Sequence, residues 1–440
     1  MKRGRVMKRG RVWGTALATL SLGLLASGPA LAQAPSQVDS GDTAWLLSTT
    51  ALVLLMSLPG LALFYGGLVR TKNVLSVLMQ CTAVACLASV VWLALGYSLA
   101  FSGTAPFIGD LGRVGLMGLS RGDAIGTVPE IVFFAFQMAF AIITPALMIG
   151  AVVERVKFAG LLAFCAGWLV LVYAPVCHWI WGGGWMATLG VKDYAGGLVV
   201  HATAGISALL LARAVGPRDG YPRELSPPHN PGMTMTGAGL LWVGWYGFNG
   251  GSALAANADA GAALTATHMA AASAGLVWAL IEHRRFGRSS LVGLVTGVVA
   301  GLATVTPASG FISPLAGLFL GALGSYVCFE AVTLVKARLK VDDSLDVFAV
   351  HGVGGILGTL MLAVLAHPLL GGTGYAEGVT LAGQAWRQGL GVLVVCAWSA
   401  GASLVLIAIV RRLTGLRASD EVIDEGLDLG AHGERAYHIS

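Results

Sequence analysis

Long apolar stretches alternate with short polar connections along almost the whole chain. Eleven of them approach or exceed the ~20 apolar residues that a helix needs to cross a bilayer. They are residues 43–69, 75–103, 126–153, 158–181, 194–212, 233–256, 261–281, 289–306, 311–335, 346–366 and 385–410. The only extended polar segment after them is the tail that follows Arg411. The pattern predicts an all-α polytopic membrane protein with eleven transmembrane helices.

The composition agrees with a bundle in lipid. Of 440 residues, 56% are hydrophobic and 11% are charged, whereas a soluble domain carries roughly 25% charged residues. The 62 glycines suit helices that pack closely through small residues. Six cysteines lie in or beside apolar segments without a CxxC pair, so we expect small buried hydrophobes and no metal site. The net charge of +5 comes from loops and the N-terminus, and predicts no nucleic-acid partner.

The N-terminus has the features of a cleaved secretory signal peptide over residues 1–32. Residues 1–12 are basic, residues 14–27 are apolar, and Ala30-Leu31-Ala32 provides a small-residue cleavage site. An uncleaved first helix is the alternative. Because MKRGRV occurs at 1–6 and again at 7–12, Met7 is a second candidate start. The predicted organisation is a signal peptide, a membrane domain over 33–411 and a tail over 412–440.

Basic residues divide the loops into two sets, and lysine and arginine concentrate on the cytoplasmic side of membrane proteins. Taken alternately, one set carries Arg70, Lys72, Arg155, Lys157, Arg213, Arg218, Arg223, Arg284, Arg285, Arg288, Lys336, Arg338 and Lys340. The other set carries Arg113, Arg121, Lys192 and Arg387. We therefore expect a multi-pass protein of the inner (plasma) membrane, with the mature N-terminus outside and the C-terminus in the cytoplasm.

Two spans share an internal echo. Asp193 precedes His201 by eight residues, Asp343 precedes His351 by eight, and small residues follow each histidine. The first pair opens the fifth span, which starts outside, and the second opens the tenth, which starts inside. The echo favours a 5+5 inverted repeat related by a pseudo-twofold axis, with the eleventh helix outside it. An aspartate that caps a helix is ordinary, however, and accounts for part of the pattern.

Both histidines are expected near the middle of the membrane, where lipid makes polar side chains costly. A single buried histidine is more often a packing residue, but two at matching depth favour a function. A neutral imidazole both donates and accepts a hydrogen bond. His201 and His351 can therefore bond to each other and still face a small polar solute.

Several motifs resemble ammonium transporters of the Amt/MEP type. They are Trp181-Gly-Gly-Gly, Asp193-Tyr-Ala-Gly-Gly-Leu-Val-Val-His201, Gly244-Trp-Tyr-Gly-Phe-Asn-Gly-Gly-Ser252, Asp346-Val-Phe-Ala-Val-His351-Gly and Glu425-Gly-Leu-Asp-Leu-Gly-Ala-His-Gly-Glu-Arg-Ala-Tyr437. They occur in the family's order, and the resemblance runs from about residue 40 to the end of the chain.

The resemblance implies a role for each matching residue. An outer vestibule of Phe140, Trp181 and Ser252 would recruit ammonium through aromatic faces and a hydroxyl. Phe140 and Phe248 would form a stacked gate, and His201 and His351 would line the pore below it. Asp193 would support the structure near the recruitment site, and Asp343, its inverted counterpart, is expected from its position to cap a helix. The resemblance also implies a homotrimer and a trimeric PII signal-transduction protein as a cytoplasmic partner, without a cofactor.

Elementary energetics limit what can cross such a pore. An ionised ammonium in an apolar lumen loses hydration worth tens of kcal/mol, and a cation–π contact of about 2 kcal/mol does not offset that loss. Recruitment of the cation should therefore be followed by deprotonation. Electrogenic transport and neutral ammonia channelling both stay open. So do an ammonium sensor with little flux and an Rh-type gas channel, whereas no catalytic motif predicts an enzyme.

Three further features carry expectations of their own. Lys192 places a positive charge beside Asp193, which would weaken cation capture. Glu330 lies in the ninth apolar span and is expected to reach toward Lys336. The tail spaces Gly426, Gly430 and Gly433 among apolar residues, which predicts an ordered segment on the cytoplasmic loops rather than a disordered end.

Overall fold

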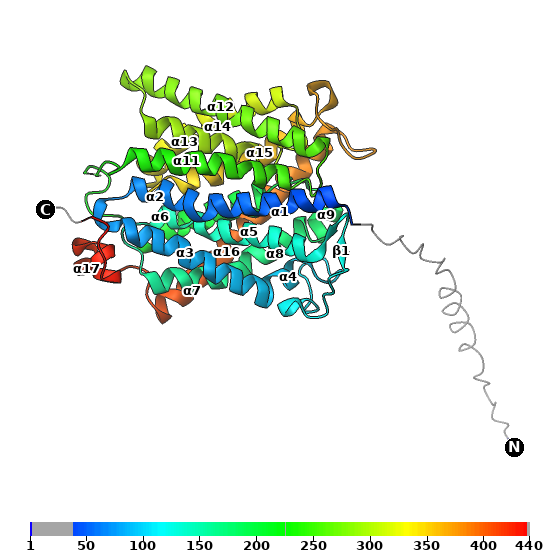
Figure 1. Cartoon of the computed structure of the whole chain (residues 1–440), viewed down its shortest axis with the longest axis horizontal. Helices are drawn as coiled ribbons and strands as arrows, with labels where there is room; N and C mark the ends of the chain where they lie inside the picture. Colours follow the sequence, from blue (N-terminus) through cyan, green and yellow to red (C-terminus); the bar gives the residue numbers. More distant parts are fainter. Residues whose placement is uncertain (2–37, 225, 438–440) are drawn as a thin grey trace. The chain divides into compact units, whose positions relative to one another are not determined.

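The computed structural model describes residues 1, 38–224 and 226–437. The predicted signal peptide lies outside the described residues. Within the unit that starts at Val38, long helices run side by side along one direction (Figure 1).

The elements of the first half follow one another with short connections. They are α1 (Ser40–Leu55), η1 (Met56–Gly60), α2 (Leu61–Leu68), η2 (Thr71–Asn73), α3 (Val74–Val91), η3 (Trp92–Gly96), α4 (Tyr97–Phe101), η4 (Val114–Leu116), β1 (Ala124–Ile125), β2 (Val128–Pro129), α5 (Glu130–Leu147), α6 (Ile149–Val152), α7 (Phe158–Trp168), η5 (Leu169–Tyr173), α8 (Ala174–Ile180), α9 (Trp185–Leu189), η6 (Gly197–Ala202) and α10 (Thr203–Val215).

The second half has the same character and ends in two short helices. Its elements are α11 (Pro231–Trp245), η7 (Tyr246–Gly250), α12 (Ala258–Phe286), α13 (Leu291–Val305), α14 (Pro314–Leu334), η8 (Val335–Leu339), η9 (Phe348–Gly352), α15 (Val353–Leu365), η10 (Pro368–Leu370), α16 (Leu381–Leu413), α17 (Asp420–Glu425) and α18 (Leu427–His432).

Nine helical segments within the described residues are long and apolar enough to cross a membrane. They are Ser40–Leu68, Thr71–Phe101, Glu130–Val152, Phe158–Leu189, Gly197–Val215, Ala258–Phe286, Pro314–Leu339, Phe348–Leu365 and Leu381–Leu413. The other two expected segments are also helical: α11 continues into η7, and α13 is a shorter apolar helix. The multi-pass helical fold is thus confirmed, while the total of eleven crossings stays a prediction.

A small β-hairpin precedes α5, where the sequence predicts only helix. β1 and β2 pair antiparallel through two residues each, and Gly126 adopts a φ of +59° in the turn between them. Strands of two residues are too short to show an alternation of apolar and polar residues in the sequence. The start of the expected third span at residue 126 is therefore wrong, because the helix begins only at Glu130.

In the part of the chain that the structure describes, seven helical segments contain a wider π-helical turn, in which the backbone hydrogen bonds span one more residue than in an α-helix. Three of these turns carry candidate residues: η6 holds His201, η7 holds Phe248 and η9 holds His351. Such turns often occur at functional sites, because they re-aim side chains out of the regular helical stripe.

The two helices that carry the histidines cross in close contact, and the small residues after each histidine explain why. A methyl group added at Gly205 would clash with the backbone of Gly352, and one added at Gly355 would clash with His201. Each glycine lies four residues after its own histidine and packs against the opposite histidine's helix. This reciprocal contact brings the two histidines together.

The end of the bundle that carries Arg70, Lys72, Arg155, Lys157 and Arg218 is called the basic end below. Arg155 is fully buried there and donates to the Gly216 and Asp342 carbonyls and to the Ser344 hydroxyl. Buried arginines are stable only when their donors are paired in this way. The network holds several loops of the basic end to one another.

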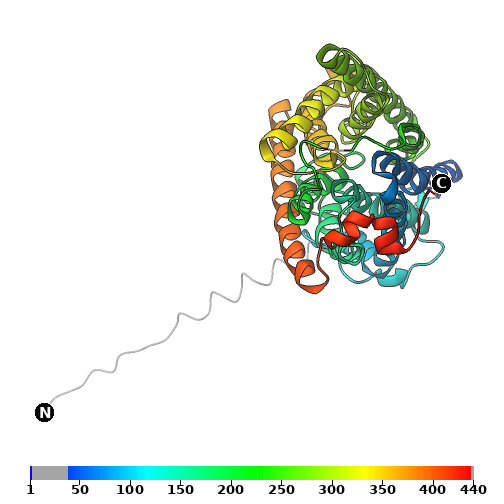
Figure 2. The ribbon, with the colours of Figure 1, turned by 90° about the vertical axis from the view of Figure 1, so that its left-hand side faces the viewer.

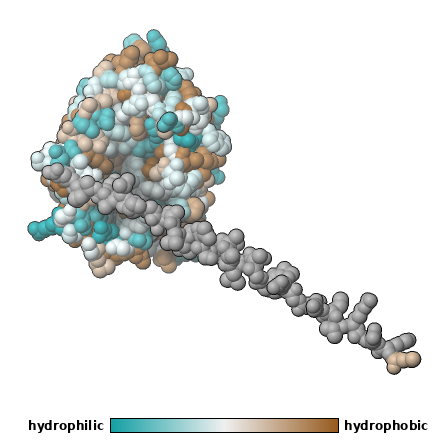
Figure 3. All heavy atoms as spheres, turned by 90° about the vertical axis from the view of Figure 1, so that its right-hand side faces the viewer, coloured by the Kyte–Doolittle hydropathy of each residue, from teal (hydrophilic) through white to brown (hydrophobic). Residues whose placement is uncertain are grey.

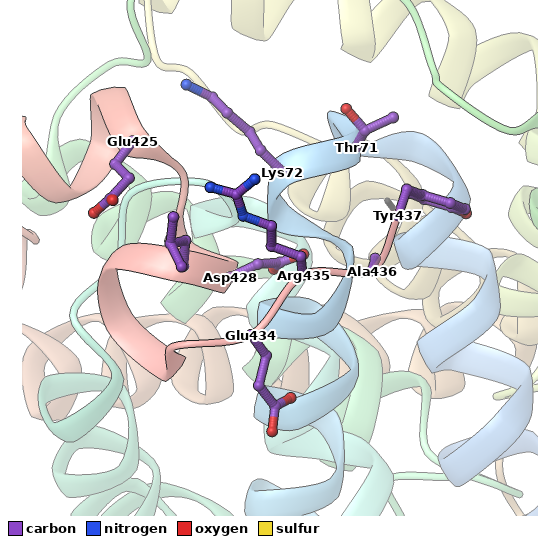
Figure 4. A pocket seen from close by; sticks show the side chains of 9 residues that line it. Thr71, Lys72, Glu425, Asp428, Glu434, Arg435, Ala436 and Tyr437 are labelled. Atoms are coloured by element: carbon purple, nitrogen blue, oxygen red, sulfur yellow. The ribbon is translucent and has the colours of Figure 1, made fainter. Parts of the chain in front are cut away.

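Residues 418–437 include the short helices α17 and α18 and cover part of the basic end, as Figures 1 and 2 show. The Asp428 carboxylate accepts from the amides of Leu75 (3.1 Å) and Ser76 (2.7 Å), and Asn73 Oδ1 accepts from the Leu427 amide (2.8 Å). A pocket of about 310 Å³ lies between this segment and the loop of Thr71 and Lys72 (Figure 4). The tail therefore packs on loops, as its glycine spacing predicts.

At the opposite end of the bundle, polar and apolar side chains alternate over the visible surface (Figure 3). This end carries the hairpin, the loop between α4 and α5, and α9 (Figure 1). It is called the outer end below.

Two expectations are wrong, one about Glu330 and one about the cysteines. Glu330 pairs with Arg285 of α12, while Lys336 pairs with Asp346 at 2.7 Å. Glu330 therefore joins α14 to α12 instead of reaching along its own helix. Among the six cysteines, Cys86 is exposed on α3 and Cys396 is partly exposed, so not all are buried.

Candidate functional site

Two phenylalanines from different helices lie face to face in the interior. The rings of Phe140 on α5 and Phe248 on η7 have centroids 4.3 Å apart and an angle of 23° between their planes. Both side chains are almost fully buried. Stacked rings at this separation leave no passage between them, so any solute that follows this path must displace a ring.

Trp181 stands at right angles to this pair, at the outer end of α8. Its ring lies 5.7 Å from that of Phe140 with an interplanar angle of 89°. The indole Nε1–H donates to the carbonyl of Asp193 at 2.8 Å, which fixes the ring's orientation. The arrangement presents two aromatic faces to one region, a geometry that attracts cations.

Ser252 joins the same region through Phe248. Its hydroxyl donates to the Phe248 carbonyl at 2.8 Å, and the residue is only partly buried. Because that proton is engaged, the lone pairs of the hydroxyl oxygen stay available to accept a hydrogen bond from a cation. The structure thus brings Phe140, Trp181 and Phe248 into direct contact and attaches Ser252 through the backbone.

Asp193 holds the start of the fifth helical segment. Its carboxylate accepts from the amides of Gly196, Gly197, Leu198 and Val199 at 2.7–3.0 Å. Gly196 has a φ of +117°, which glycine adopts readily and which turns the chain around the carboxylate. The carboxylate therefore faces a helix N-terminus, where negative charge is favoured, rather than the aromatic rings.

Asp343 repeats this role before the tenth segment with fewer partners. It accepts from the amides of Val347 (3.0 Å) and Phe348 (2.7 Å). Burial, together with the nearby Asp346 carboxylate, raises the pKa of Asp343 to about 7. Each aspartate lies eight residues before its histidine, but the two carboxylates differ in the number of amides they accept from and in the charges near them.

The imidazoles of His201 and His351 lie below the phenylalanines. Their ring centroids are 5.2 Å apart with an interplanar angle of 22°, so the rings stack. His201 Nδ1, His201 Nε2 and His351 Nδ1 are buried without a hydrogen-bond partner among the described residues. The hydrogen bond expected between the two histidines is therefore not made. Unpaired buried nitrogens are costly, and a small polar molecule between the walls would satisfy them.

A narrow cavity runs from Phe248 to both histidines. Its volume of about 10 Å³ suits roughly one water-sized molecule. Apart from the histidines, the walls are apolar or aromatic: Met56, Leu61, Phe64, Tyr65, Ile143, Leu147, Val200, Leu241, Trp245, Phe248 and Val299. A second pocket of about 200 Å³ also reaches His351 and is lined by Arg218, Lys336 and Asp346. The apolar cavity thus meets, at His351, a pocket of the basic end that has charged residues in its lining.

A family model described as the Ammonium Transporter Family matches residues 44–437. The chain belongs to the ammonium transporter family.

Relatives of this family match over nearly their whole length. The ammonium transporter of Bacillus subtilis is 41% identical over 408 residues, which cover 92% of this chain and 100% of that protein. The ammonium transporter of Aquifex aeolicus is 40% identical, with 92% and 95% covered. The Candida albicans Mep2 structure has a TM-score of 0.80 at 35% identity, with 88% of each chain covered. A solved structure named "Sensor Amt Protein" has a TM-score of 0.82 at 29% identity, with 89% and 98% covered.

Trp245 is a residue of the site that was not expected from the sequence. Its ring stacks on His201 with centroids 5.6 Å apart and an angle of 22°, and its Nε1–H donates to Thr306 Oγ1 at 2.9 Å. It lies inside the Gly244–Ser252 motif, three residues before Phe248. A tryptophan placed among glycines, three residues before Phe248, was the available signal.

The Lys192 ammonium does not face the rings of Phe140, Trp181 and Phe248. Its ammonium donates to the Gly374 carbonyl at 3.1 Å and lies 4.7 Å from the centre of the Phe311 ring. The carbonyl and the ring both hold the cation on the side of η10 and α14. The expected weakening of cation capture by Lys192 stays a prediction that this geometry does not favour.

Within the described residues, no group of three or more His, Cys, Asp or Glu side chains could hold a metal ion.

Proposed function

We propose that this protein transports ammonium across the inner membrane. Phe140, Trp181 and Ser252 recruit the cation at the outer end, and Phe140 with Phe248 closes the path below them. The cation gives up its proton, and ammonia passes the apolar cavity lined by His201 and His351. Asp193 supports the site by holding the start of its helix and the carbonyl that orients Trp181.

One observation carries this proposal. Three histidine nitrogens beside a cavity of apolar walls have no hydrogen-bond partner among the described residues, and the cavity lies directly beneath a stacked aromatic pair. A bare ammonium ion in such walls would pay a desolvation cost that one or two hydrogen bonds do not offset. Ammonia is neutral, fits the space of one water molecule, and both donates and accepts. The cavity therefore favours the neutral form, whereas the aromatic region above it favours the cation.

The proposed gate predicts altered flux in Phe248→Ala. Its ring contacts Phe140 and lies 6.1 Å from the His201 ring, so removal opens the stacked pair and admits water. We expect uptake of methylammonium by proteoliposomes to change at least about tenfold, because a path that is no longer closed and dry does not force the cation to give up its proton.

The matched control is Phe329→Ala. Phe329 is also a buried aromatic residue, but it packs on Trp278 away from the cavity. Both changes remove similar packing, worth about 3–5 kcal/mol. Equal flux in the two variants would show that Phe248 acts only by packing.

The membrane arrangement follows from the fold and the loop charges. We place eleven segments across the bilayer by adding α11–η7 and α13 to the nine longer ones, with the first ten as a 5+5 inverted repeat. The reciprocal contacts of Gly205 and Gly355 support the repeat. The basic end lies in the cytoplasm, because it gathers the lysines and arginines of one loop set, and the mature N-terminus lies outside.

A sensor with little flux is the second candidate, because a structural neighbour bears the name "Sensor Amt Protein". Both functions would use the recruitment site, but only transport needs the histidine-lined cavity. Measurable flux that depends on Phe248 would favour transport.

The assembly proposed from the family resemblance is a homotrimer with one pore in each subunit. A trimeric PII protein would bind at the cytoplasmic exits, and the tail would take part in that regulation. The tail's hydrogen bonds to residues 73–76, where η2 ends and α3 begins, support a mechanical connection to the bundle.

Deletion of residues 420–440 is expected to lower basal flux or to remove inhibition by the host's PII protein, without unfolding the bundle. Asp428→Asn should reproduce part of the effect, because it weakens two amide contacts, whereas Asp420→Asn should not, since Asp420 is 87% exposed. Flux is measured with and without PII. Unchanged flux and inhibition in the truncated protein would show that the tail has no part in transport or in its regulation.

A further inference from the structure

A partly exposed ion pair lies at the basic end, where the apolar cavity meets its charged pocket. Lys336 of η8 and Asp346, which precedes η9, both line the pocket of about 200 Å³ that reaches His351. The Lys336 Nζ lies 2.7 Å from Asp346 Oδ1 and donates to Oδ2 at 2.9 Å. The two side chains are 29% and 20% exposed. A solute that leaves the cavity through this pocket therefore passes the pair.

Lys336 is the recorded cation on the Asp346 carboxylate within the described chain. Arg218 lines the same pocket, but its guanidinium donates to both carboxylate oxygens of Asp342, at 2.9 and 3.0 Å. Asp346 Oδ1 is close to the Lys336 ammonium but accepts no hydrogen bond among the described residues. Burial raises the pKa of Asp346, and the charge of Lys336 opposes that shift. The carboxylate thus depends on one cation, and one of its oxygens still has the capacity to accept.

The backbone holds Asp346 in an unusual conformation. Its φ is +60°, in the left-handed region that few residues other than glycine adopt. The Asp346 amide donates to the Asp343 carbonyl at 3.2 Å, and its carbonyl accepts from the Val350 amide at 2.9 Å. Residues kept in such conformations cluster at functional sites, where the surrounding structure positions a side chain. The start of η9 therefore fixes the carboxylate at the wall of the pocket.

The solute that would arrive here resembles the end of a lysine side chain. Ammonia that leaves the apolar cavity takes up a proton from the water it meets and becomes ammonium, a small cation with N–H donors. The lysine ammonium group is likewise a compact charge, with three N–H donors. The pocket of about 200 Å³ has room for such an ion together with water, since one water molecule takes about 30 Å³ of liquid. The Asp346 carboxylate suits either cation through the same kind of contact.

We propose that Asp346 is an inner binding site for ammonium and small alkylammonium ions, and that Lys336 occupies this site as a tethered ammonium group. The tethered group competes with the arriving ion, so the ion leaves the pocket instead of staying on the carboxylate. The arrival of the ion rests on the proposed function, whereas the binding site can be tested without transport.

Binding is measured by thermal unfolding of the full-length protein, purified in detergent and kept in mildly alkaline buffer. Lys336→Met removes the charge and keeps a side chain of similar length, so Asp346 loses its cation. Replacement of sodium chloride by ammonium chloride at equal concentration should raise the Tm of Lys336→Met by at least about 1 °C more than that of wild type. Methylammonium should act like ammonium, whereas tetramethylammonium, which has no N–H donor, should not.

The double variant that combines Lys336→Met with Asp346→Asn measures binding at the proposed outer recruitment site, and its ammonium shift should equal that of wild type. Lys340→Met is the matched control, because it removes an exposed lysine charge four residues further along the chain. Lys336→Gln retains a neutral donor for Asp346 and is a second variant that should show the larger shift. Ammonium shifts in Lys336→Met and Lys336→Gln that do not exceed those of wild type or of the double variant overturn the site.

The effect on the exit is measured as uptake of labelled methylammonium by right-side-out membrane vesicles that contain either ammonium or sodium. Internal ammonium should slow the initial uptake by Lys336→Met at least about threefold more than the uptake by wild type, an effect of the size that a partly exposed ion pair supports. Equal inhibition in the two proteins overturns the competition. If wild type moves no more methylammonium than vesicles without the protein, the proposed function fails, while the Tm shift still decides whether Asp346 binds ammonium.

Discussion

Asp193→Ala is expected to abolish ammonium flux and to destabilise the protein. The carboxylate accepts four backbone hydrogen bonds from the start of the helix that carries His201. Alanine would leave buried amides without partners, at about 1–3 kcal/mol for each group that finds no other acceptor. The same loop carries the carbonyl that holds the Trp181 indole, so the recruitment site would lose its geometry together with the helix start.

Asp193→Asn separates charge from hydrogen bonding. Its amide oxygen still accepts, but its NH2 group meets amides that also donate, so we expect a folded protein with flux lowered at least about tenfold. Asp259→Ala is the control, because Asp259 also lies in the first turn of a helix but is exposed. Flux in proteoliposomes and thermal unfolding give the two readouts. A stable, fully active Asp193→Ala protein would refute this role.

Replacement of His201 or His351 should change transport while leaving the fold intact. Among the described residues, neither nitrogen of His201 nor Nδ1 of His351 has a hydrogen-bond partner, so His201→Ala and His351→Ala each break no internal hydrogen bond that the structure records. A solute crossing the cavity, in contrast, would lose a donor or acceptor. One net hydrogen bond corresponds to roughly a five- to tenfold change in ammonium flux or in its ratio to potassium flux.

The double variant sharpens this test. Because the rings stack at 5.2 Å, the effects of the two changes should not add, and a double-mutant cycle should show coupling. His268→Ala is the control, since His268 is exposed on α12 and bonds to Tyr246. If both single variants transport like wild type with unchanged selectivity, the pair is packing.

The positions of the helices could be predicted because apolar runs of sufficient length leave few alternatives in a membrane protein. The aspartate–histidine echo also indicated correctly that His201 and His351, 150 residues apart in the chain, lie in one region. The small residues after each histidine were visible in the sequence. Their role as the crossing point of two helices needs the fold, because it depends on which helices meet.

Other features depend on contacts that no local pattern encodes. The stacking of His201 on Trp245 follows from the π-helical turns and the helix crossing, and these also set the two imidazoles parallel instead of edge to edge. Glu330 has Lys336 within reach along the chain, yet it pairs with Arg285 across the interface of α14 and α12. The four amides on Asp193 require the left-handed turn at Gly196, whereas a simple cap would supply fewer.

The most direct test of the account is an ammonium gradient imposed on proteoliposomes that contain the purified wild-type protein. Current on a supported membrane and internal pH are recorded together. We expect an ammonium-dependent signal in at least one of the two recordings. It should saturate with ammonium and exceed the pH change of protein-free liposomes, which neutral ammonia also crosses. A current would mean that the proton follows ammonia, and a faster pH change without current would mean neutral passage. If there is no ammonium-dependent current and the pH change is no faster than in protein-free liposomes, the claim that this protein transports ammonium is contradicted.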